Sequence, residues 1–447
     1  MEFYDREYEL NTLNKNWEQS ASHSMMTTMI GRRRIGKTSL LLKSAEGQKS
    51  LYLYVSKDNE QMLCKKFQQQ AERQLGMHIH GTVSSFGALF EELMMYGLGN
   101  HYTLIIDEFQ NVLSINKAIP SEIQDIWDRY KDSTTVNLIL CGSIYSMMKR
   151  IFENVDEPLY GRSDSAIRLN PFQTDVLRLI LQDHNQNFKP DDLLCLYMLT
   201  GGVAKYVALL MDAKATTCAK MLKYATAPDS PFITEGIELL VSEFGRDYGT
   251  YFSILQLIAA GMTTQSEIDS VIGKNSGAYL SNLCDDYSFI SKNTPMFSKQ
   301  GARNIRWSID DCYLRFWFRF IYPHQDLIES GRTALLQQYV TENYEQFTGR
   351  TLERWFQTKV MESGKYTRVG NWWDKRGENE LDLIAVNEFN NTGMIAEVKR
   401  NERKISMAVL ENKVAVLPQK DLAKYNIQLN ALSLKDIYGF HNNKIYG

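Results

Sequence analysis

The chain has 447 residues and a formal net charge of −3, from 50 Lys and Arg against 53 Asp and Glu. This length predicts about two to four domains, and the near balance of charge excludes a uniformly basic protein, so any contact with nucleic acid must be local. No apolar stretch approaches the roughly 20 residues of a membrane span, and the first residues lack the segments of an export signal. The six cysteines contain no C-x-x-C pair and indicate reduced, buried thiols, so we expect a cytoplasmic protein that does not enter a membrane.

Apolar runs and helical stretches alternate over the first 170 residues. Strands are predicted at 25–30, 50–56, 102–107 and 136–141, and helices at 38–46, 60–75, 84–97 and 121–131. This alternation is typical of a parallel α/β sheet.

The segment that joins the first strand to the next helix fits the phosphate-binding pattern G-x-x-x-x-G-K-[ST]. It reads Gly31, Arg32, Arg33, Arg34, Ile35, Gly36, Lys37 and Thr38, and Ser39 follows. Its glycines let backbone N–H groups converge on a phosphate, Lys37 can reach the β- and γ-phosphates, and the Thr38 hydroxyl can ligate Mg²⁺. Bound phosphate would lie at a helix N-terminus, which favours negative charge. Residues 31–39 therefore predict a site for ATP and Mg²⁺. The three arginines either contact the triphosphate or point into solvent, and the sequence leaves both alternatives open.

A second motif supports this site. The apolar run from Thr103 ends in Asp107 and Glu108, as expected of a buried parallel strand with acids at its C-terminal end. Asp107 would hold the Mg²⁺ shell opposite Thr38, and Glu108 would orient the water that attacks the γ-phosphate. The alternative is a strand that ends in a solvated turn. The pair of motifs favours hydrolysis over binding alone.

The pattern changes three times beyond residue 170. Helical periodicity dominates residues 171–240, where we expect a helical lid. Residues 241–325 have the pattern of a small helical fold with a hairpin. Residues 326–447 return to mixed α/β, with strands near 366–373, 380–386 and 393–399.

A second group of candidate catalytic residues lies in this last zone. Alternation puts Asp382 on one face of its strand, and Glu397 with Lys399 on one face of the next, so the three converge if these strands form an antiparallel hairpin. Two carboxylates can hold Mg²⁺, and the lysine can orient or deprotonate a water that attacks a phosphodiester. Glu353, on a preceding helix, would complete the metal shell. A solvated hairpin edge with alternating charges has the same pattern and stays the alternative.

The N-terminal two thirds of the chain resembles the archaeal-type ATPase family, in the AAA+ and signal-transduction branch of phosphate-loop enzymes. The resemblance rests on the arginine-rich loop and on segments 3–10, 107–110, 138–143, 158–162 and 201–206, although Ala204 stands where the family usually has proline. It implies that Arg6 lies near the adenine and ribose and that Ser143 is a sensor near the γ-phosphate.

Arg162 takes the most consequential role that the resemblance implies. A guanidinium on the γ-phosphate stabilises charge that develops during hydrolysis. Arg162 would do so in its own subunit or from a neighbouring one in a homo-oligomer. The alternative is a surface arginine that pairs with Glu157 or Asp164.

The rest of the chain resembles the remaining parts of the same architecture. Residues 248–321 resemble a winged helix, and the order Asp382, Glu397, Lys399 resembles a restriction-endonuclease-like core. A helix near 277–283 would take the recognition position, but the following Asp285 and Asp286 repel phosphate, so a structural or protein-contacting role is weighed against DNA reading. The implied division is a phosphate-loop ATPase core at 1–170, a helical lid at 171–240, a winged helix at 241–325 and a restriction-endonuclease-like domain at 326–447.

Two functions therefore compete. In the first, a Mg²⁺-dependent ATPase controls a nuclease-like C-terminal domain that acts on nucleic acid, with DNA as the expected substrate. In the second, the C-terminal site is inactive, and ATP binding switches the chain between states that recruit a partner protein. The expected cofactors are ATP and Mg²⁺, and the expected partners are DNA, a second copy of the chain or a partner protein.

Overall fold

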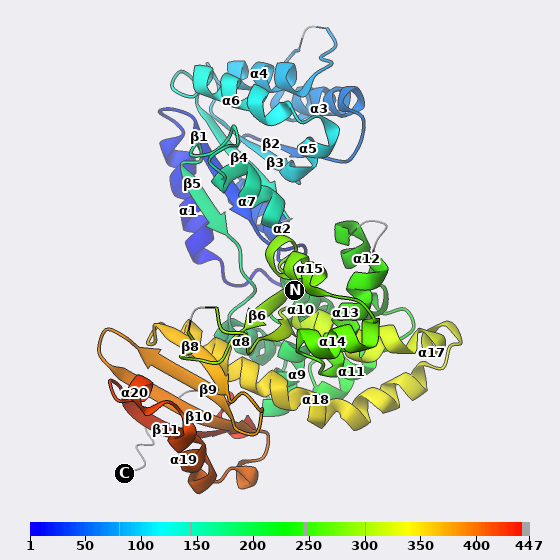
Figure 1. Ribbon diagram of the computed structural model, residues 1–447. Coiled ribbons are helices and arrows are strands. Elements are labelled where there is room, and N and C mark those ends of the chain that lie inside the picture. The colour runs from blue at the N-terminus through cyan, green and yellow to red at the C-terminus, as the bar shows by residue number, and fades with distance from the viewer. Residues whose placement is uncertain (80, 144, 245–247, 300, 440–447) are drawn as a thin grey trace. The chain divides into compact units, whose positions relative to one another are not determined.

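The computed structural model describes residues 1–439 apart from 80, 144, 245–247 and 300 (Figure 1). The chain forms two compact units, one of residues Asp5–Pro171 and one of Met1–Tyr4 together with Phe172–Gly447. Both units are α/β, which confirms the predicted fold class, with a five-stranded parallel sheet in the first and a four-stranded sheet in the second. The boundaries predicted at residues 240 and 325 fall inside the second unit and stay predictions. Among the described helices, none combines the length and apolar character needed to cross a bilayer.

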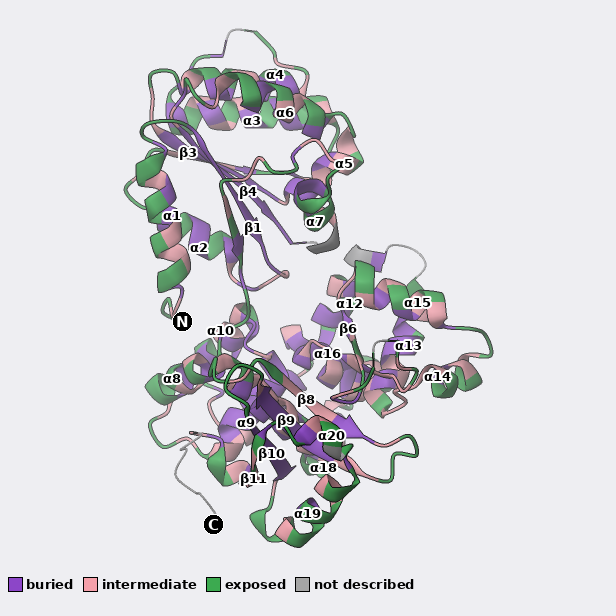
Figure 2. Cartoon of the chain, turned by 60° about the vertical axis from the view of Figure 1, so that its left-hand side comes forward, coloured by how far each residue is buried: buried purple, intermediate pink, exposed green. Residues whose placement is uncertain are grey.

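The first unit is built on a parallel sheet of strand order β2-β3-β4-β1-β5. The strands are β1 (Met25–Ile30), β2 (Ser50–Tyr54), β3 (Tyr102–Asp107), β4 (Val136–Gly142) and β5 (Ser165–Arg168). Every residue of β1, β3 and β4 is buried, as Figure 2 shows in purple, because helices cover both faces of a parallel sheet. The four strands predicted from the sequence are confirmed.

Helices of the first unit pack on the two faces of this sheet. They are α1 (Glu7–Gln19), α2 (Lys37–Ser44), α3 (Glu60–Leu75), α4 (Phe86–Tyr96), α5 (Val112–Ile115), α6 (Ile119–Tyr130) and α7 (Tyr145–Glu153). The main apolar core lies between the sheet and α3, α4, α6 and α7, and includes Phe67, Phe90 and Trp127. The predicted helices are confirmed, whereas α1, α7 and the short strand β5, in which only Ile167 is buried, were not predicted.

Helices form most of the first half of the second unit, as the periodicity of residues 171–240 predicts. They are α8 (Thr174–His184), α9 (Pro190–Thr200), α10 (Ala204–Asp212), α11 (Cys218–Ala225), α12 (Pro231–Phe244), α13 (Tyr248–Ala260), α14 (Gln265–Ile272), α15 (Gly277–Ser281), α16 (Cys312–Phe316) and α17 (Gln325–Glu329). The antiparallel hairpin of β6 (Ile290–Asn293) and β7 (Arg306–Ile309) stands between α15 and α16.

The C-terminal sheet has the strand order β11-β10-β9-β8 and packs on the long helix α18 (Thr333–Glu362). Its elements are β8 (Arg368–Trp373), β9 (Glu380–Asn387), β10 (Thr392–Lys399), α19 (Met407–Val416), α20 (Gln419–Leu422) and β11 (Asn426–Ser433). Strand β9 pairs antiparallel with β8 and β10, so the predicted hairpin is confirmed. Strand β11, which pairs parallel with β10, was not predicted, because its mostly polar sequence has no run of apolar residues.

The loop between β6 and β7 packs against the C-terminal sheet. Met296 is 7% exposed and lies in the apolar core of that sheet, and its N–H donates to the carbonyl of Asn371 at 2.8 Å. The indole of Trp373 donates to Asn304 at 2.9 Å and carries the Arg306 guanidinium 4.6 Å from its ring centre. The hairpin and the C-terminal sheet therefore form one packed body.

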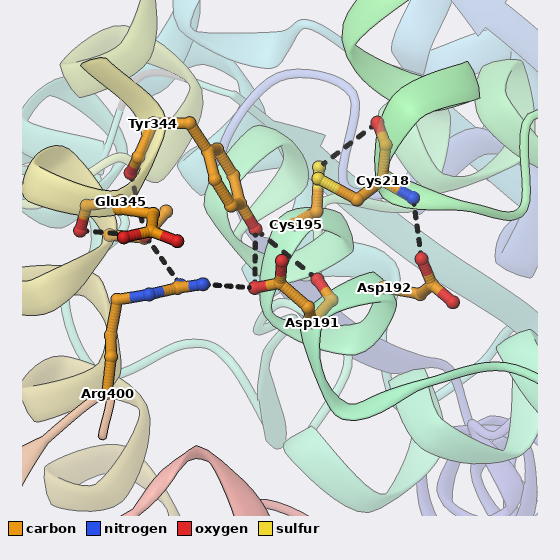
Figure 3. Close-up of polar contacts among 8 residues, drawn as sticks. Asp191, Asp192, Cys195, Cys218, Tyr344, Glu345 and Arg400 are labelled. Carbon is orange, nitrogen blue, oxygen red and sulfur yellow. Dashed lines mark hydrogen bonds and ion pairs between the residues drawn. The ribbon is translucent and has the colours of Figure 1, made fainter. Parts of the chain in front are cut away.

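A polar cluster fastens the end of β10 to the helical part of the same unit (Figure 3). Arg400 donates to the carboxylate of Asp191 on α9 at 2.8 Å and to the hydroxyl of Thr348 on α18 at 2.7 Å. The Tyr344 hydroxyl donates to the same Asp191 oxygen at 3.0 Å. Each hydrogen bond to a charged group contributes about 1.5–3 kcal/mol, so the strand that carries Lys399 is held firmly against α9 and α18.

The buried position of Met296 leads to a stability prediction. Replacing Met296 with Ala should lower the free energy of unfolding by about 2 kcal/mol or more, because it leaves a cavity in the core of the C-terminal sheet. Urea denaturation measures this, with Met361→Ala as the control, since Met361 is 55% exposed. Equal effects of the two changes would contradict the packing of the β6–β7 loop described above.

Candidate functional site

The phosphate-binding pattern folds as a tight loop between β1 and α2. Gly36 has a φ of 99°, and a Cβ on Gly31 would lie 2.9 Å from the carbonyl oxygen of Leu169, so both positions favour glycine. Lys37 is 6% exposed, and its ammonium donates to the carbonyls of Gly31 and Arg32 at 2.7 and 3.1 Å. The ammonium is thus held within the loop, close to where the pattern expects phosphate oxygens.

The carboxylate of Asp107 joins the loop to the neighbouring strand. Its Oδ2 accepts from the Thr38 hydroxyl at 3.1 Å, and its Oδ1 accepts from the Glu108 N–H at 2.8 Å. A hydroxyl and a carboxylate oxygen are ligand types that Mg²⁺ uses beside phosphate and water. The predicted pair Thr38 and Asp107 is therefore brought together in a geometry that fits this cation.

Tyr52 on β2 is a member of this site that the sequence did not reveal. Its hydroxyl donates to the Oδ2 of Asp107 at 2.6 Å, the same oxygen that Thr38 contacts. Burial and the hydrogen bond to Asp107 raise the pKa of Tyr52, so the hydroxyl keeps its proton at neutral pH. Tyr52 therefore orients the carboxylate of Asp107.

Glu108 is held in a conformation that few residues other than glycine adopt. Its φ is 55°, and left-handed backbone of this kind is often found where a side chain is aimed for function. Its Oε2 accepts from the Ser143 hydroxyl at 2.7 Å and from the side-chain amide of Gln110. Glu108 and Ser143 were both predicted for this site, and the structure brings them together. No described residue donates a hydrogen bond to the Oε1 of Glu108.

The other predicted nucleotide ligands lie at the same ends of the strands. Arg6 is buried and donates to the carbonyl of Asn170 at 2.7 Å, just after β5, whose last residue is level with the end of β1. The remaining loop residues follow β1 directly, with Ile35 buried, Thr38 and Ser39 exposed, and Arg32, Arg33 and Arg34 half-buried.

Arg162 lies at the opposite ends of the strands. Asp164 bonds through its N–H to the carbonyl of Met26 at 2.8 Å, which places this segment beside the start of β1 and not beside the loop that follows its end. Arg162 pairs with Asp128 of α6 at 2.8 Å, and not with Glu157 or Asp164. In this chain, therefore, Arg162 is separated from its own phosphate loop by the length of β1, about 15–20 Å at roughly 3.3 Å per residue.

The three predicted residues of the C-terminal hairpin also converge. The Lys399 ammonium lies 3.0 Å from the Oδ2 of Asp382 and 3.1 Å from the Oε1 of Glu397. The two carboxylates are 7% and 6% exposed, and Asp382 also accepts from the Val398 N–H at 2.9 Å. Burial opposes the charge of Lys399, but Asp382 and Glu397 outweigh it and raise the pKa of this lysine, which keeps its proton at neutral pH.

Glu353 lies beside this group on α18. Burial, and next the negative charge of Asp382, raise the pKa of Glu353 to about 8. Gln357, one turn further along α18, donates to the backbone carbonyl of Asp382 at 2.8 Å. This face of α18 therefore fits against the hairpin end that carries the candidate carboxylates.

Lys413 of α19 is a second addition to the predicted set. Its ammonium lies 2.9 Å from both side-chain oxygens of Glu397. In the part of the chain that the structure describes, no group of three or more His, Cys, Asp and Glu is placed to hold a metal ion. The carboxylates of Asp382 and Glu397 both contact the Lys399 ammonium. A divalent cation in the place of that ammonium would have two ligands, so these residues supply part of a metal site. The place of Glu353 in a metal shell stays a prediction.

Comparison with known proteins gives two family matches. Residues 3–210 match the family described as "ATPase domain predominantly from Archaea". Residues 317–411 match the family described as "Archaea bacterial proteins of unknown function".

Similar proteins are found both by sequence and by structure. An uncharacterized protein of Methanocaldococcus jannaschii is 29% identical over 416 residues, which cover 90% of this chain and 88% of that protein. A Walker-type ATPase of Pyrococcus abyssi has a similar fold, with a TM-score of 0.51 and 17% identity over 71% of this chain and 96% of that one. The ORC2 protein of Aeropyrum pernix aligns with a TM-score of 0.47 and 16% identity over 76% of this chain and 96% of that one.

The raised pKa of Glu353 predicts a specific dependence of stability on pH. Between the ordinary carboxyl pKa of about 4.3 and pH 8, the folded chain keeps a proton on Glu353 that the unfolded chain releases, so this residue lowers stability as pH rises. Glu353→Gln removes the effect, and the variant should match the wild type near pH 4 and unfold at a higher temperature above pH 8. Thermal unfolding followed by circular dichroism checks this, and a difference independent of pH would contradict it.

Proposed function

We propose that the chain hydrolyses ATP with Mg²⁺ at the C-terminal ends of its parallel strands, because residues 3–210 match the family of ATPase domains predominantly from Archaea. The observation that carries the proposal is the single network in which Asp107 contacts Thr38 and Tyr52 while Glu108 contacts Ser143. This network directly adjoins the loop that holds the Lys37 ammonium.

Each residue of the network has a defined task in this reaction. Lys37 leaves the carbonyls of the loop for the β- and γ-phosphates, and backbone N–H groups at the start of α2 bind the same anion. Thr38 and Asp107 would hold the Mg²⁺, which when bound neutralises charge on the phosphates. Glu108 orients the attacking water through its Oε1, while Ser143 and Gln110 keep its Oε2 in place.

Arg162 can serve the same reaction only from another copy of the chain. Its place at the far ends of the strands supports a role in completing the site of a neighbouring subunit and does not support a role at its own. The specific ATPase activity should then rise with protein concentration and fall in Arg162→Ala. An activity per subunit that is constant on dilution would contradict this role.

Tyr52 provides the sharpest test of the ATP site. Tyr52→Phe removes one hydrogen bond from Asp107, a loss of about 1 kcal/mol, and should lower ATP turnover about fivefold and raise the Mg²⁺ concentration needed for half-maximal rate. Tyr54→Phe, two residues along the same strand, should behave like the wild type, because Tyr54 is 46% exposed and Asp107 accepts its tyrosine hydroxyl bond from Tyr52 instead. Lys37→Ala should abolish turnover. Phosphate release measured across Mg²⁺ concentrations checks all three, and identical Mg²⁺ curves for Tyr52→Phe and the wild type would contradict the role of Tyr52.

For the C-terminal domain, we propose metal-dependent cleavage of nucleic acid, controlled by the ATPase. The supporting observation is the convergence of Asp382, Glu397 and Lys399 at one point of the β9–β10 hairpin. Asp382 and Glu397 would hold a divalent cation, which supplies a Lewis acid for a phosphodiester. Lys399 orients the attacking water. Lys413 is held by Glu397 and has to move aside for the cation.

The contacts of Lys413 support a second candidate function. Because Lys399 and Lys413 together neutralise Glu397, the group is also stable as a purely structural salt-bridge network. The chain would then be a nucleotide switch, in which ATP changes the state of the molecule and a partner protein is recruited. ATP-dependent binding of a partner without cleavage of any nucleic acid is the expected behaviour in that case.

One cleavage experiment separates the two candidates. The full chain is incubated with Mg²⁺ and labelled single- and double-stranded DNA and RNA, with and without ATP. If the first candidate holds, Asp382→Ala abolishes cleavage and Lys413→Ala retains or increases it. Lys435→Ala serves as the control, because Lys435 forms an exposed ion pair with Glu402. Absence of cleavage by the wild type, beside normal phosphate release, would leave the nucleotide switch.

A further inference from the structure

Two arginines near the C-terminal site, Arg315 and Arg350, form no ion pair with an acidic side chain among the described residues. Arg315 of α16 is half-buried, and its guanidinium lies 5.6 Å from the centre of the Phe347 ring on α18. Arg350, one turn after Phe347 on α18, is exposed. Within the described part of the chain, neither guanidinium forms a hydrogen bond or an ion pair. A partly buried cation without a partner is unfavourable, so its presence needs an explanation.

A third arginine extends this group. Arg354 lies on the same side of α18, because positions 347, 350 and 354 are one and two turns apart. It donates to the carbonyl of Ile309 at 2.7 Å and approaches Asp310 at 3.3 Å, which fixes its side chain. Burial, and then the like charge of Arg354 and Arg350, lower the pKa of Arg315 to about 10. The three arginines therefore form a cluster with one weak acidic contact.

The arginine cluster (Arg315, Arg350 and Arg354) adjoins the candidate cleavage site. Arg350 and Glu353 are one turn apart on α18, and the charge of Arg350 acts on Glu353. The charge of Asp382 in turn acts on Glu353, and Gln357 of the same helix bonds to the carbonyl of Asp382, so the cluster lies on the helix that packs against the β9–β10 hairpin. An arginine fork binds the oxygens of a phosphate well, and partial burial increases the strength of that contact.

We propose that the arginine cluster is a binding seat for backbone phosphates of nucleic acid, which places the strand next to Asp382 and Lys399. The inference rests on the proposed action of the C-terminal domain on nucleic acid and deepens it, since it names the substrate group and the residues that receive it. It also gives a reason for the uncompensated charge of Arg315, because a bound phosphate would supply the missing counter-ion.

Binding of labelled oligonucleotides to the full chain tests this seat. Fluorescence anisotropy with fluorescein-labelled 20-mers of single- and double-stranded DNA and of RNA is measured in EDTA, so cleavage does not interfere. Arg315→Gln with Arg350→Gln should weaken binding about tenfold or more and reduce the dependence of log K on log salt by about one unit for each arginine. Arg332→Gln, an exposed change at the start of α18, should leave both quantities unchanged. Retained affinity and salt dependence in the double variant would overturn the proposal.

Two further measurements separate binding from a purely structural role. Arg315→Gln should unfold at the same temperature as the wild type or at a higher one, because it removes an uncompensated charge. Arg315→Lys should recover at most part of the affinity that Arg315→Gln loses, because it keeps the charge but not the fork. A large drop in the unfolding temperature of Arg315→Gln would overturn the proposal, as would equal affinity of the wild type for polyglutamate.

The binding measurements test the arginine cluster separately from the cleavage measurements. If the wild type cleaves no oligonucleotide while Arg315→Gln with Arg350→Gln binds them about tenfold more weakly than the wild type, the seat stands and the cleavage proposal fails. If cleavage depends on Asp382 while binding ignores Arg315 and Arg350, the cleavage proposal stands and the seat fails.

Discussion

The carboxylate of Asp107 holds together the candidate ATP site. It is 3% exposed and accepts hydrogen bonds from three separate parts of the chain, namely Thr38 after the phosphate loop, Tyr52 on β2 and the backbone of Glu108. A buried carboxylate is stable only when its oxygens accept hydrogen bonds. Each of these three donors therefore helps to keep the Asp107 carboxylate in its position. Asp107 thereby fixes the loop relative to the strand end and holds the strained backbone at Glu108 in place.

Charge balance organises the second unit in a related way. At the β9–β10 hairpin, two lysines satisfy the buried Asp382 and Glu397, while in the arginine cluster of α16 and α18 only Arg354 has an acidic partner, Asp310, among the described residues. Arg400, directly after Lys399, is tied to α9 and α18. The hairpin end is thus a group of paired charges, and the arginine cluster is a neighbouring group in which positive charge exceeds negative charge.

Local patterns in the sequence predict the central sheet, the phosphate loop and the hairpin of Asp382, Glu397 and Lys399 because strand periodicity and fixed spacing carry that information. Tyr52 and Lys413 are different. Each reaches its carboxylate from an element remote in sequence, and a lone tyrosine or lysine in a strand or helix has no local signature. Strands β5 and β11 were missed because both lie at sheet edges and are largely polar. The segment 158–162 identifies Arg162 in the sequence. Its pairing with Asp128 depends on how α6 packs against that segment, which the sequence does not reveal.

The placement of Arg162 limits how copies of the chain can assemble. The arginine and the phosphate loop lie at opposite ends of the same strands, so one surface of a subunit offers the guanidinium and a different surface offers the nucleotide. A two-fold symmetric dimer presents the same patch from both partners and cannot join these two surfaces. An arginine that completes a neighbour's site therefore demands head-to-tail contacts, which close into a ring or continue as a helical filament.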